Sequence, residues 1–419
     1  MVKYFLILIL LILHHVTMAQ RPVMGRRLEF LSIDEVGSGT QAIGMAQAVT
    51  GYIRGADAIY YNPAGMTYIQ KTDITTSFNF KYTQPEFRYD TLTSLKSYRS
   101  QIGGSSFTLN QFATAFPLHL GNDEQVTMTF GYGYRQLTSW AGKFVDTEEL
   151  KPATPGTTPP RFDYNYINKN NPNLNSFGFA MRSFYGFSFG LTYNIIGGKT
   201  TQEITTNLNG LVFADTNYNR SRDIKLSGRY TEFGMMFHPI KYISLGVRWR
   251  APYQLSTDTI NNNTSFSQSV TYQMPNFFSV GIAGKPKKNL AITVDYRQEN
   301  WTNVRQMSGS DKLKINNPNF RTLHYGSIGV HVGVGIFGYR YKPLFYKDAN
   351  GKEIATHTIA LGVMSKSASK FKLCMEVEYI PEHTVSTNLH HKMHQQVISF
   401  LINTGFTIGG KNNEDENWQ

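Results

Sequence analysis

The sequence predicts an all-β fold, a transmembrane antiparallel β-barrel of about 14 strands with an N-terminal hatch that plugs the lumen. Three observations support this fold class. Apolar and polar residues alternate with a period of two along much of the chain. The links between the alternating segments are long and short in turn. Aromatic residues make up 14% of the chain and charged residues 17%, yet no apolar stretch is long enough for a membrane-spanning helix.

The alternation is clearest in the segment 126–135, which reads VTMTFGYGYR. The same pattern recurs in 242–250, 290–297 and 371–379. Successive residues of a strand point to opposite faces, so each segment has one apolar face and one polar or small face. A sandwich of two sheets also alternates, but a chain of this length would then have to split into domains. Segments of this kind along the whole chain favour a single wall with one face toward lipid.

The connection lengths predict the topology. The short links allow only tight reversals, while the long links allow loops, and the link 141–173 alone contains five prolines. This alternation is typical of barrels with short periplasmic turns and long outer loops, and it places both ends of the barrel on the periplasmic side. The long links are 84–103, 141–173, 206–222, 254–266, 302–319, 343–356 and 381–391, and the short ones are 119–124, 184–185, 238–241, 285–288, 333–335 and 365–370.

The N-terminus predicts export. Lys3 precedes an apolar run from Tyr4 to Leu13, and small residues end at Ala19, a pattern typical of a secretory signal peptide over residues 1–19. The lone Cys374 excludes an intrachain disulfide framework. The net charge of +12 suits an anionic lipid surface or, equally, solvated loops and turns.

A run of small residues from Gly37 to Met66, GSGTQAIGMAQAVTGYIRGADAIYYNPAGM, has too little apolar bulk to form its own core. It ends on an Asn-Pro turn, in which Pro63 forces Asn62 out of the helical region. Such a segment is suited to fold inside a cavity that the rest of the chain provides. The candidate hatch residues are Gly39, Gly44, Asn62, Pro63, Ala64, Gly65 and Met66.

This stretch resembles the N-terminal hatch of the FadL family, outer-membrane barrels that carry long-chain fatty acids and other hydrophobic compounds. The similarity continues in FGMMFHP followed by LGVRWRAP, and in MPNFFSVGIAGKPKKNLAITVDYRQENW. Two features depart from the family pattern, Arg54-Gly55 before the turn and the polar C-terminal run KNNEDENWQ. We therefore expect a signal peptide at 1–19, the hatch at 20–70, the barrel at 71–410 and a polar tail at 411–419.

The resemblance implies passive uptake of a hydrophobic small molecule, which enters the barrel from the outer loops and leaves sideways through a lateral gate when the hatch shifts. Gly131 and Gly133 on the third strand are candidate gate residues, although they would equally make room for the plug. The inward-facing charges predict a paired network or, alternatively, a site for an anionic head group. Those candidate lumen residues are Arg135, Arg248, Arg250 and Arg297.

The alternative function is an adaptor for secreted proteins, because the PorV-like barrels of type IX secretion carry a similar hatch. Catalysis is not expected, since no G-x-S-x-G, Walker or H-E-x-x-H motif occurs. No cofactor and no metal site are expected. The expected partners are the hydrophobic ligand, outer-membrane lipids, the barrel assembly machinery of a Gram-negative cell and, under the alternative, a protein on an outer face, with no role for nucleic acid.

Overall fold

The computed structural model describes residues 39–89, 98–99, 104–120, 126–137, 142–149, 161–169, 172–183, 186–209, 216–262, 267–308, 311–314, 321–347, 351–364, 372–386 and 391–408. The predicted signal peptide, the first part of the predicted hatch region and the polar tail at 411–419 lie outside these residues.

Short helical segments precede the strands. They are α2 (Thr40–Gly44), η3 (Ala56–Tyr60) and η4 (Pro63–Tyr68), with η5 (Trp301–Asn303) between two later strands. The strands are β1 (Thr72–Tyr89), β2 (Tyr98–Arg99), β3 (Gly104–Leu120), β4 (Val126–Gln136), β5 (Gly142–Glu149), β6 (Arg161–Lys169), β7 (Asn173–Arg182), β8 (Phe187–Gly197), β9 (Lys199–Asn209), β10 (Thr216–Ile240), β11 (Ile243–Arg250), β12 (Tyr253–Asn261), β13 (Ser267–Met274), β14 (Phe277–Lys287), β15 (Leu290–Asn300), β16 (Arg305–Ser308), β17 (Asp311–Lys314), β18 (Thr322–Val332), β19 (Gly335–Lys347), β20 (Glu353–Met364), β21 (Lys372–Ser386) and β22 (His391–Ile408). No helix among the described residues is long and apolar enough to cross a membrane.

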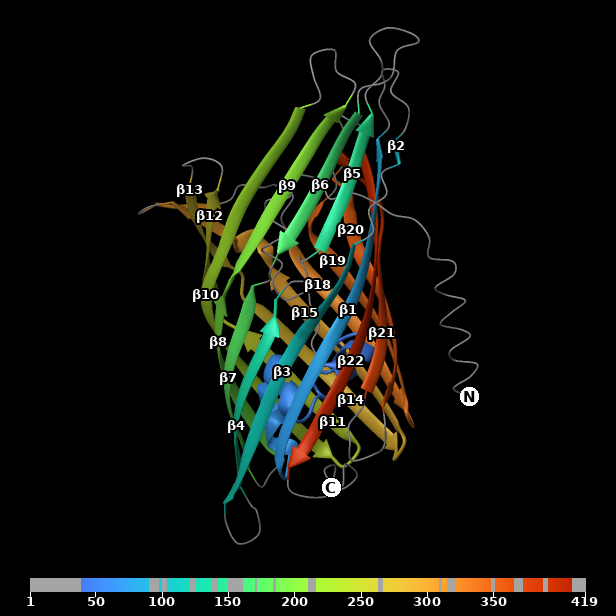
Figure 1. The fold of residues 1–419 in the computed structure, drawn as a ribbon. Helices are drawn as coiled ribbons and strands as arrows, with labels where there is room; N and C mark the ends of the chain where they lie inside the picture. Colours follow the sequence, from blue (N-terminus) through green and yellow to red (C-terminus); the bar gives the residue numbers. More distant parts are fainter. Residues whose placement is uncertain are drawn as a thin grey trace.

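Fourteen of the described strands form a ring of antiparallel pairings, which confirms the predicted strand number. β22 pairs with β1 along the full length of both strands, from Thr72 opposite Ile408 to Tyr89 opposite His391, so the ring returns to its start. The order around the ring is β1, β3, β4, β7, β8, β10, β11, β14, β15, β18, β19, β20, β21 and β22. Figure 1 shows this ring with the hatch (blue) inside it.

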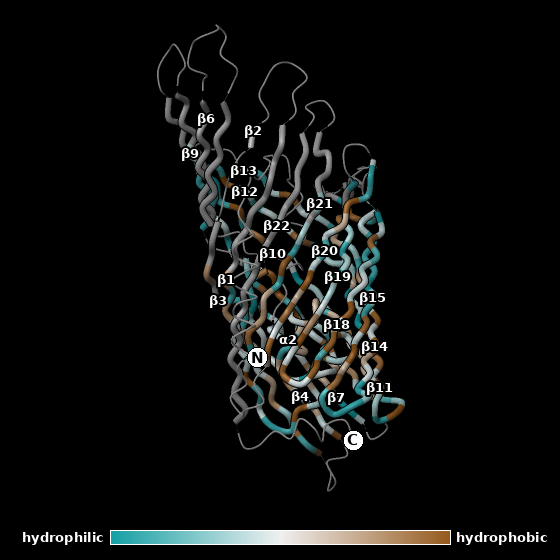
Figure 2. Tube along the Cα trace, turned by 90° about the vertical axis from the view of Figure 1, so that its right-hand side faces the viewer, coloured by the Kyte–Doolittle hydropathy of each residue, from teal (hydrophilic) through white to brown (hydrophobic). Residues whose placement is uncertain are grey.

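The two faces of the wall differ as the alternation predicts. On β15, Val294 is 52% exposed, whereas its neighbours Thr293 and Asp295 are 1% and 5% exposed. The same relation holds on β4, where Phe130 is 48% exposed and Thr129 is buried. Figure 2 shows hydrophobic residues along the strands of the wall. An apolar outer band of this kind is suited to lipid, while the inner face is small or polar.

The prediction that the long links are loops is partly wrong, because several of them contain strands. β5 and β6 lie in the link predicted at 141–173, and β9 pairs with both β6 and the upper half of β10. In a second extension, β12 pairs with β10 and β13, and β16 pairs with β13 and β17. These strands, such as YQLSTDTIN in β12, lack a continuous apolar face, so the period-2 signal does not reveal them. They rise at one end of the barrel, which we call the loop end, opposite the turn end where β1 begins and β22 ends (Figure 1).

Candidate functional site

The hatch fills the lumen toward the turn end of the barrel (Figure 1). Nearly all its side chains are buried, and Ile43, Met45, Ile53, Ile59 and Met66 are among the most completely covered side chains of the described chain. The predicted glycines lie at close contacts. An added Cβ at Gly65 would approach the carbonyl oxygen of Ile53 to 2.2 Å, and the small run is therefore what lets this segment fold so tightly.

A set of wall glycines provides the space for the hatch. At each of them, an added Cβ would lie within 3.0 Å of a hatch atom, a distance that real Cβ atoms essentially never show. The wall therefore fits this hatch closely, as expected under the alternative role of Gly131 and Gly133; the contacts of the other seven glycines were not predicted from the sequence. These glycines are Gly131, Gly133, Gly178, Gly190, Gly234, Gly246, Gly281, Gly329 and Gly338.

Asn62, the turn residue of the predicted motif, joins the hatch to itself and to the wall. Its side-chain Nδ2 donates to the carbonyl oxygens of Thr50 (2.7 Å) and of Met235 on β10 (3.1 Å). Its Oδ1 accepts from the backbone N–H of Ala64 at 3.2 Å, which caps η4 where Pro63 occupies the first helical position. A buried carboxamide with these bonds fixes the turn in one orientation.

Two carboxylates secure the hatch on the side of β1 and β3. Asp57 in η3 accepts hydrogen bonds from Thr75 Oγ1 and Gln111 Nε2, both at 2.6 Å. Asp73 on β1 accepts from the backbone N–H of Ala56 at 2.9 Å. Burial raises the pKa of Asp57, while the charge of Lys372 and the bond from Thr75 oppose that rise. On another side, Arg54, which departs from the family pattern, lies 3.1 Å from His238 and 4.6 Å from the Tyr68 ring centre.

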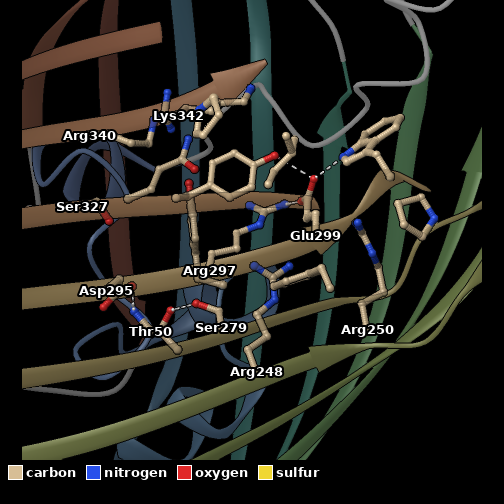
Figure 3. Close-up of a pocket in the computed structure, with 18 of the residues that line it drawn as sticks. Thr50, Arg248, Arg250, Ser279, Asp295, Arg297, Glu299, Ser327, Arg340 and Lys342 are labelled. Carbon is tan, nitrogen blue, oxygen red and sulfur yellow. Dashed lines mark hydrogen bonds and ion pairs between the residues drawn. The ribbon is translucent and has the colours of Figure 1, made fainter. Parts of the chain in front are cut away.

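On the opposite wall, Asp295 of β15 holds the loop between the helical segments. Its Oδ2 accepts hydrogen bonds from the backbone N–H groups of Val49 (2.8 Å) and Thr50 (2.7 Å). The Thr50 hydroxyl also lies 3.1 Å from Ser279 Oγ on β14, as Figure 3 shows.

A cavity lies on the loop side of this contact. It holds about 70 Å³, and hatch residues Gln47, Thr50 and Tyr61 form part of its lining. The other lining residues come from the wall and mix five basic side chains with aromatic rings and two carboxylates (Figure 3). They are Arg248, Arg250, Tyr253, Met274, Pro275, Phe277, Ser279, Asp295, Arg297, Glu299, Trp301, Leu323, Tyr325, Ser327, Arg340, Lys342 and Pro343.

Most of the arginines in this cavity are held by carboxylates. Arg248 donates to Glu232 on β10 from Nη2 at 2.6 Å and from Nε at 3.1 Å, and both side chains are buried. Arg297 pairs with Glu299, which also accepts from Trp301 Nε1 (2.9 Å) and the Tyr325 hydroxyl (2.8 Å). These pairs keep the guanidinium groups in fixed positions at the cavity surface.

The guanidinium of Arg250 lies against aromatic faces. The guanidinium carbon is 4.8 Å from the ring centre of Phe277 and 5.4 Å from those of Tyr230 and Tyr253. Phe277, which is 1% exposed, also receives Arg248 at 4.6 Å and Arg297 at 4.4 Å. One phenyl ring thus gathers three of the predicted lumen arginines around the cavity.

Some polar atoms at the cavity have no hydrogen-bond partner among the described residues. They include Gln47 Nε2 and Asp295 Oδ1. Gln47 also has a positive φ of 65°, which is uncommon for a residue other than glycine. A donor and an acceptor left open beside a basic cavity are suited to a polar group of a ligand or to water.

The structure brings together three of the four predicted lumen arginines, Arg248, Arg250 and Arg297. Arg135 lies elsewhere, 5.3 Å from the ring centre of Tyr60 in the hatch. Gly131 and Gly133 face the hatch on β4, where the Gly133 position makes room for the Tyr60 hydroxyl. β4 pairs with β3 and β7 without a register shift, so these pairings contain no strand irregularity of the kind a lateral gate would use. A gate at these glycines therefore stays a prediction.

Sequence reasoning missed several residues of the site, among them Glu232, Phe277 and Gln47. The alternation places Glu232 on the inner face, but its pairing with Arg248 depends on the register of β10 against β11. No group of three or more His, Cys, Asp or Glu within the described ranges is arranged to hold a metal ion.

Comparison with solved structures shows which fold this is. The chain is similar to a FadL homologue of Pseudomonas aeruginosa, with 11% identity, a TM-score of 0.57 and coverage of 89% of this chain and 98% of that one. It is similar to the toluene transporter TodX of P. putida at 11% identity, a TM-score of 0.56 and coverage of 90% and 99%. It is also similar to the toluene transporter TbuX of Ralstonia pickettii, with 12% identity, a TM-score of 0.52 and coverage of 90% of this chain and 100% of that one.

At these identities the likeness shows the fold, and it confirms that the chain is built like the FadL-type barrels its sequence resembles. Two of these three structures are described as toluene transporters, and the third as a FadL homologue. No protein-family model matches the sequence, and no curated protein matches it either.

Proposed function

We propose that this chain is an outer-membrane channel for the passive uptake of hydrophobic small molecules that carry an anionic group, such as long-chain fatty acids. The hatch would close the lumen to bulk flow, and the cavity on its loop side would hold the ligand before the hatch shifts. The export signal predicted at 1–19 and assembly by the barrel machinery of a Gram-negative outer membrane belong to this proposal.

The observation that carries the proposal is the composition of that cavity. Phe277 and Leu323 offer apolar contact, while Arg250, which rests on aromatic rings, offers hydrogen-bond donors. A saturated hydrocarbon would gain nothing from these buried cations and an aromatic hydrocarbon would gain only cation–π contact, whereas an anionic amphiphile uses both kinds of surface. Each methylene moved out of water contributes about 0.8 kcal/mol, and a charge-assisted hydrogen bond orients the head group.

The size of the cavity supports a head group in preference to a complete long chain. A volume of about 70 Å³ has room for roughly five to seven water molecules at about 10–15 Å³ of such space each. The head group and its first carbons would occupy this volume, and the rest of the chain would lie among the outer loops. Further travel requires the hatch to move, because Thr50 and Tyr61 line the cavity.

The comparisons support a hydrophobic ligand in general. Matched structures are described as toluene transporters and monoaromatic hydrocarbon channels, and those descriptions apply to those proteins. The clustered arginines of this chain favour an anionic amphiphile over toluene itself. How the ligand leaves is a separate question, for which Gly131 and Gly133 remain the predicted gate.

Fluorescence quenching tests this proposal. Trp301 lines the cavity, so a variant that keeps it while Trp140, Trp249 and Trp418 become Phe provides a local probe. Dibrominated stearate should quench this tryptophan at micromolar concentration in detergent, and a dibrominated neutral alkane should quench it far less.

Arg250→Gln should weaken stearate binding about tenfold, the loss of about 1.4 kcal/mol expected from one charge-assisted hydrogen bond. Arg135→Gln is the matched control, because it removes a buried arginine that does not line the cavity. Equal binding of the acid and the alkane, or no effect of Arg250→Gln, would reject the anionic head group.

A further inference from the structure

Three neighbouring strands of the wall are interrupted at the same level. β11 ends at Arg250 and β12 begins at Tyr253, β13 ends at Met274 and β14 begins at Phe277, and η5 separates β15 from β16. Below this level β11 pairs with β14 and β14 with β15, whereas above it β12 pairs with β13 and β13 with β16. Figure 1 shows β12 and β13 leaning away from the barrel above this break.

Proline explains why the ladder stops there. Pro252 and Pro275 have no backbone N–H to donate, and each lies in a two-residue gap between strands. Met274 and Phe277 are the last paired residues on either side of the second gap, so Pro275 and Asn276 contribute no rung to the wall.

Two aromatic residues beside the break indicate its depth relative to lipid. Trp249 and Phe278 are register partners directly below it, and they are 37% and 39% exposed on the outer face. Aromatic side chains of this kind gather where a barrel meets the lipid–water interface. Irregular backbone is not tolerated in contact with the hydrocarbon core, so a break just beyond these rings belongs at the head-group level of the outer leaflet.

A half-open depression of about 340 Å³, which we call the wall cavity, lies at this break. Three carboxamides and one guanidinium line it, and no carboxylate occurs among the lining residues that the structure describes. Arg305 and Asn303 are exposed, whereas Met274 is 3% exposed. The lining residues are Pro252, Gln273, Met274, Pro275, Asn276, Asn303 and Arg305.

This wall cavity adjoins the cavity beside the hatch, because Met274 and Pro275 line both of them. The two residues therefore form a partition between the head-group level outside the barrel and the arginine cluster inside it. One side of the partition presents carboxamides and Arg305, and the other presents Arg250 and Arg297. A negatively charged head group would find hydrogen-bond donors on both sides.

We propose that the break at Pro252, Pro275 and η5 is a lateral entrance, through which amphiphiles with an anionic head group pass from the outer leaflet into the lumen. The head group binds first to the carboxamides and Arg305, and it then passes Met274 to reach the arginines. The acyl chain stays on the lipid side until it follows. This entrance lies on β11–β15, away from the candidate gate on β4, and the inference rests on the proposed function.

A rate measurement tests the entrance. The single-tryptophan protein with Trp301 is placed in lipid nanodiscs and mixed with vesicles that carry dibrominated stearate, and the rate of quenching is followed. Asn276→Phe places a bulky side chain in the wall cavity. Phenylalanine is chosen over tryptophan because a second tryptophan would add its own fluorescence to that of Trp301. We expect quenching at least tenfold slower, with unchanged final quenching in detergent at equilibrium. Gln268→Phe, on the exposed end of β13, is the matched control and should leave the rate unchanged.

The outcomes separate the two proposals. If stearate does not quench Trp301 in any variant, the proposed function fails. If it binds at equilibrium but Asn276→Phe enters as fast as Gln268→Phe, the function stands and the lateral entrance is rejected.

Depth is checked independently of transport. In a Cys374→Ala background, bimane attached to Asn303→Cys should be quenched by phospholipids brominated near the head group more strongly than bimane on Gln268→Cys. Ile292→Cys, 41% exposed on the outer face, is the control for lipid contact. Quenching at Asn303 no stronger than at Gln268 would place the break outside the membrane and overturn the inference.

Discussion

The carboxylate of Asp295 on the barrel wall accepts a 2.7 Å hydrogen bond from the backbone N–H of Thr50 in the hatch. A second bond, from the N–H of Val49, reaches the same oxygen at 2.8 Å. Asp295 and Thr50 also line the cavity that we propose for the ligand. The contact that holds the hatch is therefore within reach of whatever occupies the cavity.

Asp295→Ala should loosen the hatch without unfolding the barrel. Each hydrogen bond contributes about 1 kcal/mol net, so the loss of both should cost about 2 kcal/mol and the hatch should open roughly thirtyfold more often. Hydrogen exchange at Val49 and Thr50 measures this. Asp258→Ala on β12 serves as control, because it removes a carboxylate that accepts a hydrogen bond from Ser269 on β13. Unchanged exchange in Asp295→Ala would show that the bonds do not hold the hatch.

Gly234→Val should displace the hatch and raise ion conductance in a planar bilayer. An added Cβ at this position would lie 2.1 Å from Asn62 Oδ1, so a valine side chain cannot share the space. Gly326→Val on β18 is the matched control, because nothing lies within 4 Å of its added Cβ. Equal conductance in the two variants would mean that the close fit of wall and hatch does not seal the lumen.

Replacing Asn62 and Pro63 together by alanine should leave the barrel assembled and alter flux. The substitutions remove the bonds from Asn62 to Thr50 and Met235, but the ring of wall strands makes its own ladder. Heat-modifiable migration on a gel reports barrel assembly, and stearate entry reports flux. Loss of the barrel itself would contradict the view that the hatch plugs the wall and does not build it.

The buried pair of Arg248 and Glu232 gives a double-mutant test of the cavity. Arg248→Gln alone leaves the Glu232 charge without its 2.6 Å partner, and such a loss typically costs about 3–5 kcal/mol. Arg248→Gln with Glu232→Gln should recover most of this stability in urea unfolding. If the single and double variants are equally stable, the two side chains are not coupled.

Much of the barrel follows from the sequence because its physical cause is local. The alternation in Leu290–Asn300 assigns Val294 outward and Asp295 inward without any knowledge of neighbours. Link lengths then give the strand number. The location of the hatch was predicted because its run of small residues resembles the FadL hatch. The close contacts at Asn62 and Gly65 explain why this run needs small residues.

What the sequence did not predict depends on register between strands. Glu232 meets Arg248, and Gly234 meets Asn62, only once β10 is aligned with β11 and the hatch is in place. The break in the wall is similar. Pro252 and Pro275 are visible in the sequence, but their lying at one level follows from the pairing of β11 with β14.

Gentle purification from native membranes, followed by mass spectrometry of both small molecules and proteins, tests the central claim most directly. The account predicts an anionic amphiphile such as a fatty acid at about one molecule per barrel, at reduced occupancy in Arg250→Gln and at unchanged occupancy in Arg135→Gln. An empty lumen with secreted or scaffold proteins bound in stoichiometric amount would contradict it and support the PorV-like adaptor function instead.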